Sequence, residues 1–114
     1  MSTTNSGHKA ERAAAGYLEM RGFSVMELNW RRSRAEVDII AQKDDTVFFV
    51  EVKYRATDHQ GSGLDYITTN KLNKMRLGAE LWVAETKWRG QYQLAAVEVA
   101  GRDYIVEHFI DNIL

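Results

Sequence analysis

Residues 36 to 55 constrain the fold more than any other segment of the chain. Their sequence, EVDIIAQKDDTVFFVEVKYR, contains two apolar runs of strand length separated by an acidic pair. Two such runs joined by a short polar turn are typical of an antiparallel hairpin. The pattern therefore predicts strands over 35–42 and 46–54, with a tight turn at Asp44–Asp45.

The charged residues of this hairpin are sorted onto particular faces, because side chains alternate across a strand. On the second strand Glu51 and Lys53 project to one side, and the other side is entirely apolar. On the first strand Glu36 and Asp38 project to one side, and odd-numbered apolar residues project to the other. The latter are Val37, Ile39 and Ala41.

The length of the turn fixes which charged residues face each other. A two-residue turn places Asp38 opposite Glu51 and Glu36 opposite Lys53, with directly opposed Cβ atoms about 4.5–5.5 Å apart. A three-residue turn would shift the register by one and put the acids of the two strands on opposite faces.

The opposed carboxylates predict a cation site. Two carboxylates held together in a partly buried place repel, so one takes up a proton or a cation lies between them. Oxygen ligands without nearby histidine or cysteine favour Mg²⁺ or Mn²⁺. Lys53 would hold or help to deprotonate an attacking water, or neutralise charge on a phosphate. This combination is typical of phosphodiester hydrolysis.

The same pattern also fits a hairpin without catalytic function. In that interpretation Glu36 and Lys53 form a cross-strand ion pair on a solvated face, and Asp38 and Glu51 are exposed. Phe49 lies on the same face as Glu51 and argues against full solvation. Alternation alone leaves both interpretations open.

The remaining elements predict an α/β fold. Helical spacing of apolar residues predicts helices over 6–21 and 66–85, and strand patterns occur at 23–29, 92–100 and 103–109. The polar segment 56–65, with two glycines, predicts a loop. The order helix, three strands, helix, two strands predicts a mixed five-stranded sheet flanked by helices.

Composition limits the classes of protein that fit. A chain of 114 residues fits one domain, spanning 1–114, and the absence of cysteine excludes disulfides and thiolate zinc sites. The polar N-terminus lacks the apolar stretch of a signal peptide, so we expect a soluble, cytoplasmic protein without a membrane partner. A net charge of -1 argues against binding nucleic acid by overall positive charge, but leaves room for local basic patches.

Asp38, followed a dozen residues later by Glu51-Val52-Lys53, resembles the PD-(D/E)xK nuclease motif. With the surrounding segments GHKAERAAAGYLEMRGF, NWRRSRAEVDIIAQ and VFFVEVKYR, the chain is similar to the YraN-like family of small bacterial proteins from Gly7 to about Val97. The resemblance implies a restriction-endonuclease-like fold related to archaeal Holliday-junction resolvases.

The resemblance also implies roles for individual residues. Asp38 and Glu51 would bind Mg²⁺ or Mn²⁺, and Lys53 would be the motif lysine. Glu11, on the first helix, would complete the catalytic set, with Glu36 in support. By itself, Glu11 also fits an ordinary acid in the first turn of a helix.

Two residues depart from the family pattern, since Ala35 stands in place of a glycine and Ala95 in place of an aspartate. Relatives also sometimes carry arginine for the motif lysine. Despite these departures, the resemblance implies a metal-dependent nuclease acting on structured or single-stranded DNA. The alternative is a catalytically weak or inactive nucleic-acid-binding accessory protein in DNA processing. Analogy with junction resolvases suggests a homodimer.

Basic residues around the hairpin are candidates for contacts with DNA phosphates. They are Arg31, Arg32, Arg34, Arg55, Lys71 and Lys74. Each also fits a solvated turn or helix face. The three histidines show no metal-ligand spacing, and we assign them no role.

Overall fold

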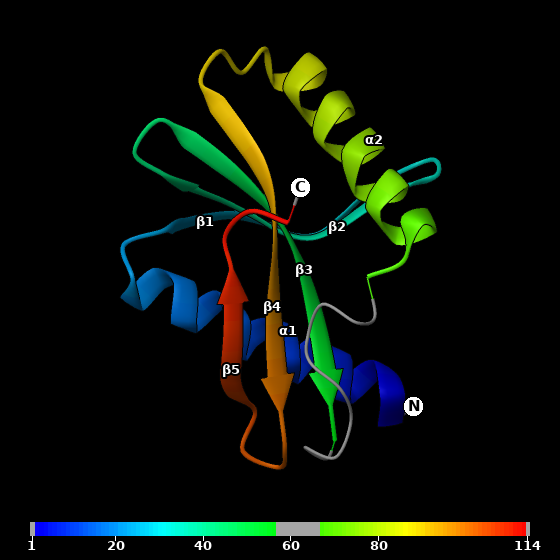
Figure 1. The fold of residues 1–114 in the computed structure, drawn as a ribbon, viewed down its shortest axis with the longest axis vertical. Helices are drawn as coiled ribbons and strands as arrows, with labels where there is room; N and C mark the ends of the chain where they lie inside the picture. Colours follow the sequence, from blue (N-terminus) through cyan, green and yellow to red (C-terminus); the bar gives the residue numbers. More distant parts are fainter. Residues whose placement is uncertain (1, 57–66, 114) are drawn as a thin grey trace.

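The computed structural model describes residues 2–56 and 67–113, and the side chains from Ser6 onward. The elements, in chain order, are α1 (Ser2–Met20), β1 (Ser24–Arg32), β2 (Ala35–Lys43), β3 (Thr46–Arg55), α2 (Thr69–Thr86), β4 (Gln91–Ala100) and β5 (Ile105–Ile110) (Figure 1). This order confirms the predicted α/β fold. The predicted loop of residues 56–65 lies, apart from its first residue, outside the described residues.

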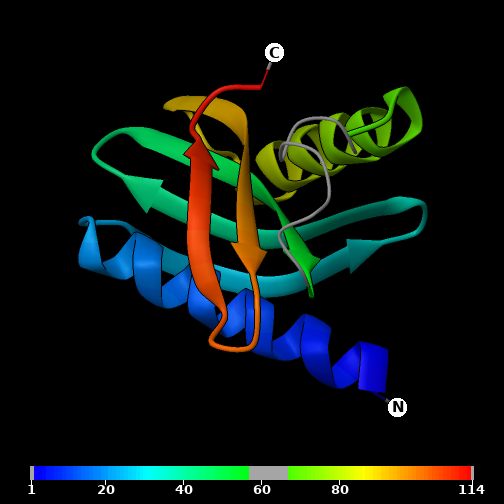
Figure 2. The ribbon, with the colours of Figure 1, turned by 60° about the horizontal axis from the view of Figure 1, so that its bottom comes forward.

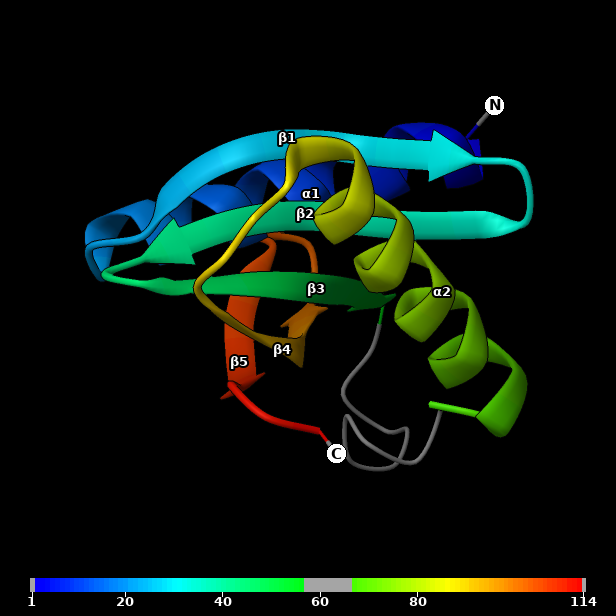
Figure 3. The same ribbon diagram turned by 90° about the horizontal axis from the view of Figure 1, so that it is seen from above.

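One mixed sheet carries the five strands of the described residues in the order β1-β2-β3-β4-β5. Its neighbouring strands are antiparallel except β3 and β4, which are parallel. Parallel neighbouring strands need a crossover connection, and α2 lies in the connection from β3 to β4. The two helices cover opposite faces of the sheet (Figures 2 and 3). Neither described helix is long and apolar enough to cross a membrane.

Each face of the sheet has its own apolar core. On one face α1 packs through apolar residues spaced one helical turn apart, among them Ala10, Ala14 and Leu18. On the other face α2 packs through Trp82, whose ring lies edge-on to Phe49 with centroids 5.7 Å apart. The predicted alternation along β3 is confirmed, because Phe48 and Val50 face α1 whereas Val47 and Phe49 face α2.

The predicted alternation along β2 is wrong at one point. Val37 packs in the core under α2, whereas Ile39 packs in the core under α1, although strict alternation puts them on one face. The switch occurs at Asp38. Asn29 on β1 lies between the pairs Leu28↔Ile39 and Trp30↔Val37, and its φ of 51° is left-handed. At this point the side chains of the β1–β2 hairpin that faced the α1 core come to face the α2 core. The tip of the hairpin extends past β3 beside α2 (Figure 3).

Gly78 of α2 lies where a larger residue does not fit. A Cβ at this position would lie 2.8 Å from Cγ2 of Val37, which is fully buried. We expect Gly78→Ala to lower the free energy of unfolding by roughly 1 kcal/mol, because overpacking costs more than the gain in helix propensity. The control, Gly16→Ala in α1, meets nothing within 4 Å and should raise it by roughly 0.5–1 kcal/mol. Urea unfolding would measure both, and changes of the same sign would contradict this packing.

Candidate functional site

The candidate site lies where β3 separates from β2. The predicted register is confirmed from Lys43↔Thr46 to Ile39↔Val50, where the paired ladder ends. The next position would oppose Asp38 to Glu51. There the Val52 amide N–H donates to Oδ2 of Asp38 at 2.8 Å. The Asp38 carboxylate thus accepts a hydrogen bond from the backbone of β3 at the point where the two strands separate.

Asp38 and Glu51 form a directly interacting pair of carboxyl groups. Glu51 is only 4% exposed, so the interpretation that these acids are simply solvated is wrong for Glu51. Burial, followed by repulsion from Asp38, raises the pKa of Glu51 to about 7. Burial also raises the pKa of Asp38, against the opposing effects of the Val52 N–H and the Lys71 charge. The pair therefore carries the unfavourable charge that a cation or a proton would relieve.

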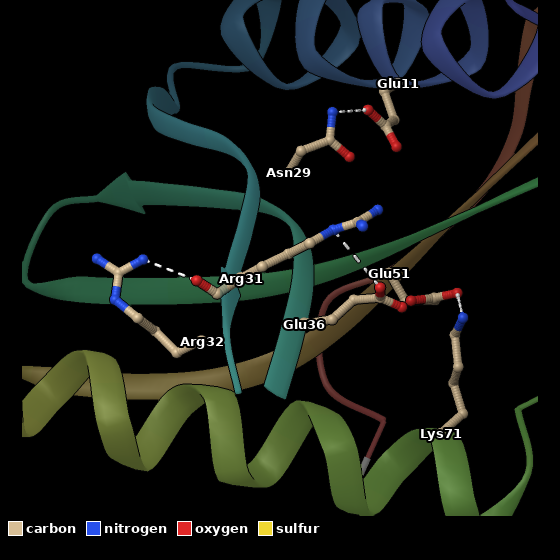
Figure 4. Close-up of polar contacts among 7 residues, drawn as sticks. All are labelled: Glu11, Asn29, Arg31, Arg32, Glu36, Glu51 and Lys71. Atoms are coloured by element: carbon tan, nitrogen blue, oxygen red, sulfur yellow. Dashed lines mark hydrogen bonds and ion pairs between the residues drawn. The ribbon is translucent and has the colours of Figure 1, made fainter. Parts of the chain in front are cut away.

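Lys71 supplies a positive charge to this pair from the start of α2. Its Nζ lies 3.0 Å from Oε2 of Glu51, a contact drawn in Figure 4. The Lys71 side chain is 38% exposed. Thr68 caps the helix by accepting from the Lys71 backbone N–H at 3.1 Å, which fixes the first turn. Burial alone would lower the pKa of Lys71, but attraction to Glu51 and its hydrogen bond, with further acids nearby, raise it.

Glu11 approaches the same place from α1, on the opposite face of the sheet. Its Oε1 accepts a hydrogen bond from Nδ2 of Asn29 at 2.8 Å (Figure 4). Burial, followed by repulsion from Asp38, raises the pKa of Glu11. The carboxyl groups of Glu11 and Asp38 therefore interact electrostatically. Sequence reasoning missed Asn29. Its one available signal is that asparagine tolerates the left-handed backbone better than most residues do.

The side chains of the predicted catalytic set line one pocket. They are Glu11, Asp38, Glu51 and Lys53. Lys53 is exposed and Lys71 borders the same pocket. Among the described residues no three histidine or acidic side chains are arranged to ligate one ion. If Asp38 and Glu51 held a cation, water would complete its coordination, as it commonly does for Mg²⁺.

Glu36 does not occupy its predicted place. The prediction set it opposite Lys53, but the β2–β3 ladder ends at Ile39↔Val50, before that position is reached. Glu36 instead pairs with Arg31 across the β1–β2 hairpin, with Oε2 and Nε 3.7 Å apart (Figure 4). The separation of β3 from β2 explains the difference.

A comparison with protein families matches residues 10–105 to a family described as "Uncharacterised protein family UPF0102". The chain belongs to this family. A UPF0102 protein of Cytophaga hutchinsonii is 31% identical over the full length of both chains. One from Vibrio parahaemolyticus is 33% identical, covering 85% of this chain and 84% of its own. One from Agrobacterium fabrum is 35% identical over 92% of this chain and 85% of its own.

The basic residues of this UPF0102 chain fall into different surroundings. Arg31, Arg34 and Lys74 line a separate groove. Nε of Arg32 lies 3.1 Å from Oε2 of Glu85. Lys71 contacts Glu51, as described above.

Arg55 differs from the other basic residues because its side chain is only 12% exposed. Its Nε lies 2.6 Å from Oε2 of the buried Glu98. A buried ion pair of this kind holds its partners in place. Contact of Arg55 with nucleic acid remains a prediction, and one that this burial disfavours.

Proposed function

We propose that this protein is a Mg²⁺- or Mn²⁺-dependent nuclease that hydrolyses phosphodiester bonds in structured or single-stranded DNA. The observation that carries the proposal is the carboxyl pair of Asp38 and Glu51, which line one pocket where β3 separates from β2. Burial raises both pKa values, and repulsion from Asp38 raises that of Glu51 further. Proteins seldom keep such a pair buried unless it binds a cation or takes part in chemistry.

The residues of the pocket suit the chemistry of phosphodiester hydrolysis. Asp38 and Glu51 would hold the divalent cation, which when bound would supply positive charge and an activated water. Lys53, two residues beyond Glu51 on β3, would neutralise charge that develops on the phosphate oxygens. Glu11, on the α1 side of the pocket, would hold a water molecule or another ligand of the cation.

The motif resemblance supports the same proposal from a different direction. The spacing from Asp38 to Glu51-Val52-Lys53 resembles the PD-(D/E)xK pattern, and the sheet is mixed and flanked by helices, as a restriction-endonuclease-like fold requires. Both arguments converge on the same side chains. We infer that the fold is of this nuclease type.

A cleavage assay tests the proposal. Branched, single-stranded and duplex DNA of one sequence would be incubated with the full chain in Mn²⁺, in Mg²⁺ and in EDTA. We expect cleavage of the branched or single-stranded substrate that requires the metal and is absent from the Asp38→Ala/Glu51→Ala double variant. Cleavage that survives in this variant would place the chemistry elsewhere or in a contaminant.

The second candidate function is binding to nucleic acid without efficient chemistry. The contact between Lys71 and Glu51 favours it, because a lysine already supplies positive charge to the acidic pair. In that case DNA binding would weaken steeply with added salt, and no substrate would be cut in either metal.

A further inference from the structure

We infer that the groove between the tip of the β1–β2 hairpin and α2 holds the backbone of one nucleic-acid strand beside the acidic pocket. The inference rests on the proposed function, since it identifies where the same substrate is held. One wall comprises Arg31, Ser33, Arg34, Ala35 and Glu36, and the other comprises Asn70, Asn73, Lys74 and Leu77.

The α2 wall is one continuous stripe of the helix. Its four residues are spaced by three, one and three positions, which places them on one side of an α-helix. The stripe presents two side-chain amides, one ammonium and one partly exposed leucine. Amides donate and accept hydrogen bonds, and an apolar side chain can contact an unstacked base. This wall therefore offers contacts to sugars and bases as well as to phosphates.

The charge of the groove differs from that of the whole chain. It contains three basic residues and one acid, whereas the net charge of the chain is -1. The acid, Glu36, lies 3.7 Å from Arg31; the Arg31 side chain is 69% exposed and that of Glu36 is 37% exposed. Such an exposed pair is weak. Arg31 can therefore turn to a phosphate at little cost, and positive charge predominates in the groove.

The groove is separate from the acidic pocket but adjoins it. The two share no lining residue. Glu36 nevertheless acts electrostatically on both Asp38 and Lys71, and Asn70 precedes Lys71 in the first turn of α2. A strand that leaves the groove toward α2's first turn passes Lys71 and reaches Glu51. The groove would thus hold nucleotides on one side of the bond to be cut.

The size of the groove favours a single strand. Its cavity volume is about 430 Å³, near the lower end of small-ligand pockets, so it accommodates a nucleotide unit or two. We expect a duplex, which is far larger than this cavity, not to enter it. Figure 3 shows the two elements that carry these walls, with the tip of the β1–β2 hairpin beside α2.

Binding measurements on the full chain in EDTA test the inference without cleavage. The probe is a fluorescein-labelled oligothymidine of about 12 nucleotides, and fluorescence anisotropy is followed over a range of salt concentrations. We expect Arg34→Ala and Lys74→Ala each to weaken binding about three- to tenfold and to reduce the salt slope by about 0.7. Asn70→Ala/Asn73→Ala should weaken binding similarly with an unchanged slope, because amides release no counterions. Alanine also favours the helix, so this variant should fold.

Arg76→Ala is the matched control, because Arg76 is an exposed cation on α2 that does not line the groove. It should bind the oligothymidine almost as the unchanged protein does. Equal losses in Arg76→Ala and Lys74→Ala would overturn the inference, as would an Asn70→Ala/Asn73→Ala variant with normal affinity. Equal affinity for a duplex of the same length would also overturn it.

These outcomes are distinct from failure of the proposed function. If the groove variants lose binding but no metal supports cleavage, the groove stands and the nuclease proposal fails. If cleavage depends on Asp38 and Glu51 but the groove variants bind normally, the nuclease proposal stands and the groove inference fails.

Discussion

Glu51→Gln is expected to lower metal-dependent cleavage of DNA by at least about a hundredfold while the protein stays folded. Glutamine keeps the shape of the side chain and one acceptor oxygen but removes the negative charge that would hold a cation next to Asp38. Initial rates of cleavage in Mn²⁺, at saturating and at low metal concentration, would measure the effect. Circular dichroism would verify that the variant is folded.

Glu80→Gln provides a control for the same chemical change. Glu80 lies on α2, is exposed, and lines neither the acidic pocket nor the groove. This variant should cleave DNA at the unchanged rate. A Glu51→Gln variant that retains full activity in Mn²⁺ would remove Glu51 from the catalytic set, whatever the state of Asp38.

The same Glu51→Gln variant is expected to be more stable than the unchanged protein at pH 8, by roughly 1–3 kcal/mol in free energy of unfolding. The folded-state pKa of Glu51 is about 7, above its ordinary value of 4.5. The folded protein therefore binds the proton more tightly than the unfolded chain does. Stability from this group is fully present below pH 4.5 and is lost as the pH rises from about 4.5 to 7. Glutamine cannot ionise, so the variant avoids this loss.

Lys71 limits the size of the gain. It loses its contact with Glu51 in the variant, but its partly exposed ammonium can turn to water, so the cost is small. Urea unfolding at intervals from pH 4.5 to 8 would measure the difference in stability between the two proteins. We expect it to grow with pH up to about 7 and then to level off. A constant difference over this range would contradict the raised pKa.

Glu98→Gln is the matched control for stability, because Glu98 is the other buried carboxylate among the described residues. Unlike Glu51, Glu98 has a mostly buried cationic partner, because Oε2 of Glu98 lies 2.6 Å from Nε of Arg55. Removing the charge should destabilise the protein by roughly 2–4 kcal/mol. The same chemical change at two buried glutamates should thus have opposite signs.

The sequence predicts the hairpin register well because that register depends on local features. Turn length and the alternation of apolar residues fix it, and the pairs from Lys43↔Thr46 to Ile39↔Val50 follow the prediction. The prediction fails beyond Ile39 for a nonlocal reason. Val37 packs with Trp30 in the core under α2, whereas Ile39 packs in the core under α1. No pattern within the hairpin contains that information.

The same distinction applies to the candidate site. Asp38 and Glu51 could be placed together by counting from a turn, because both lie on the hairpin. The Lys71–Glu51 contact joins β3 to a helix twenty positions further along the chain, and the Glu11–Asn29 hydrogen bond joins α1 to β1. Such contacts depend on how the layers pack. The importance of Glu11 follows from the resemblance to a nuclease family, not from its spacing.

A crystal structure of the full chain soaked in Mn²⁺ tests the central claim most directly, because the anomalous signal of manganese locates the ion without reference to activity. We expect one strong anomalous peak between Asp38 and Glu51, with a carboxylate oxygen of each about 2.1 Å from the ion and Lys71 displaced from Glu51. A fully soaked crystal without a peak there, and with Lys71 still on Glu51, would contradict the account.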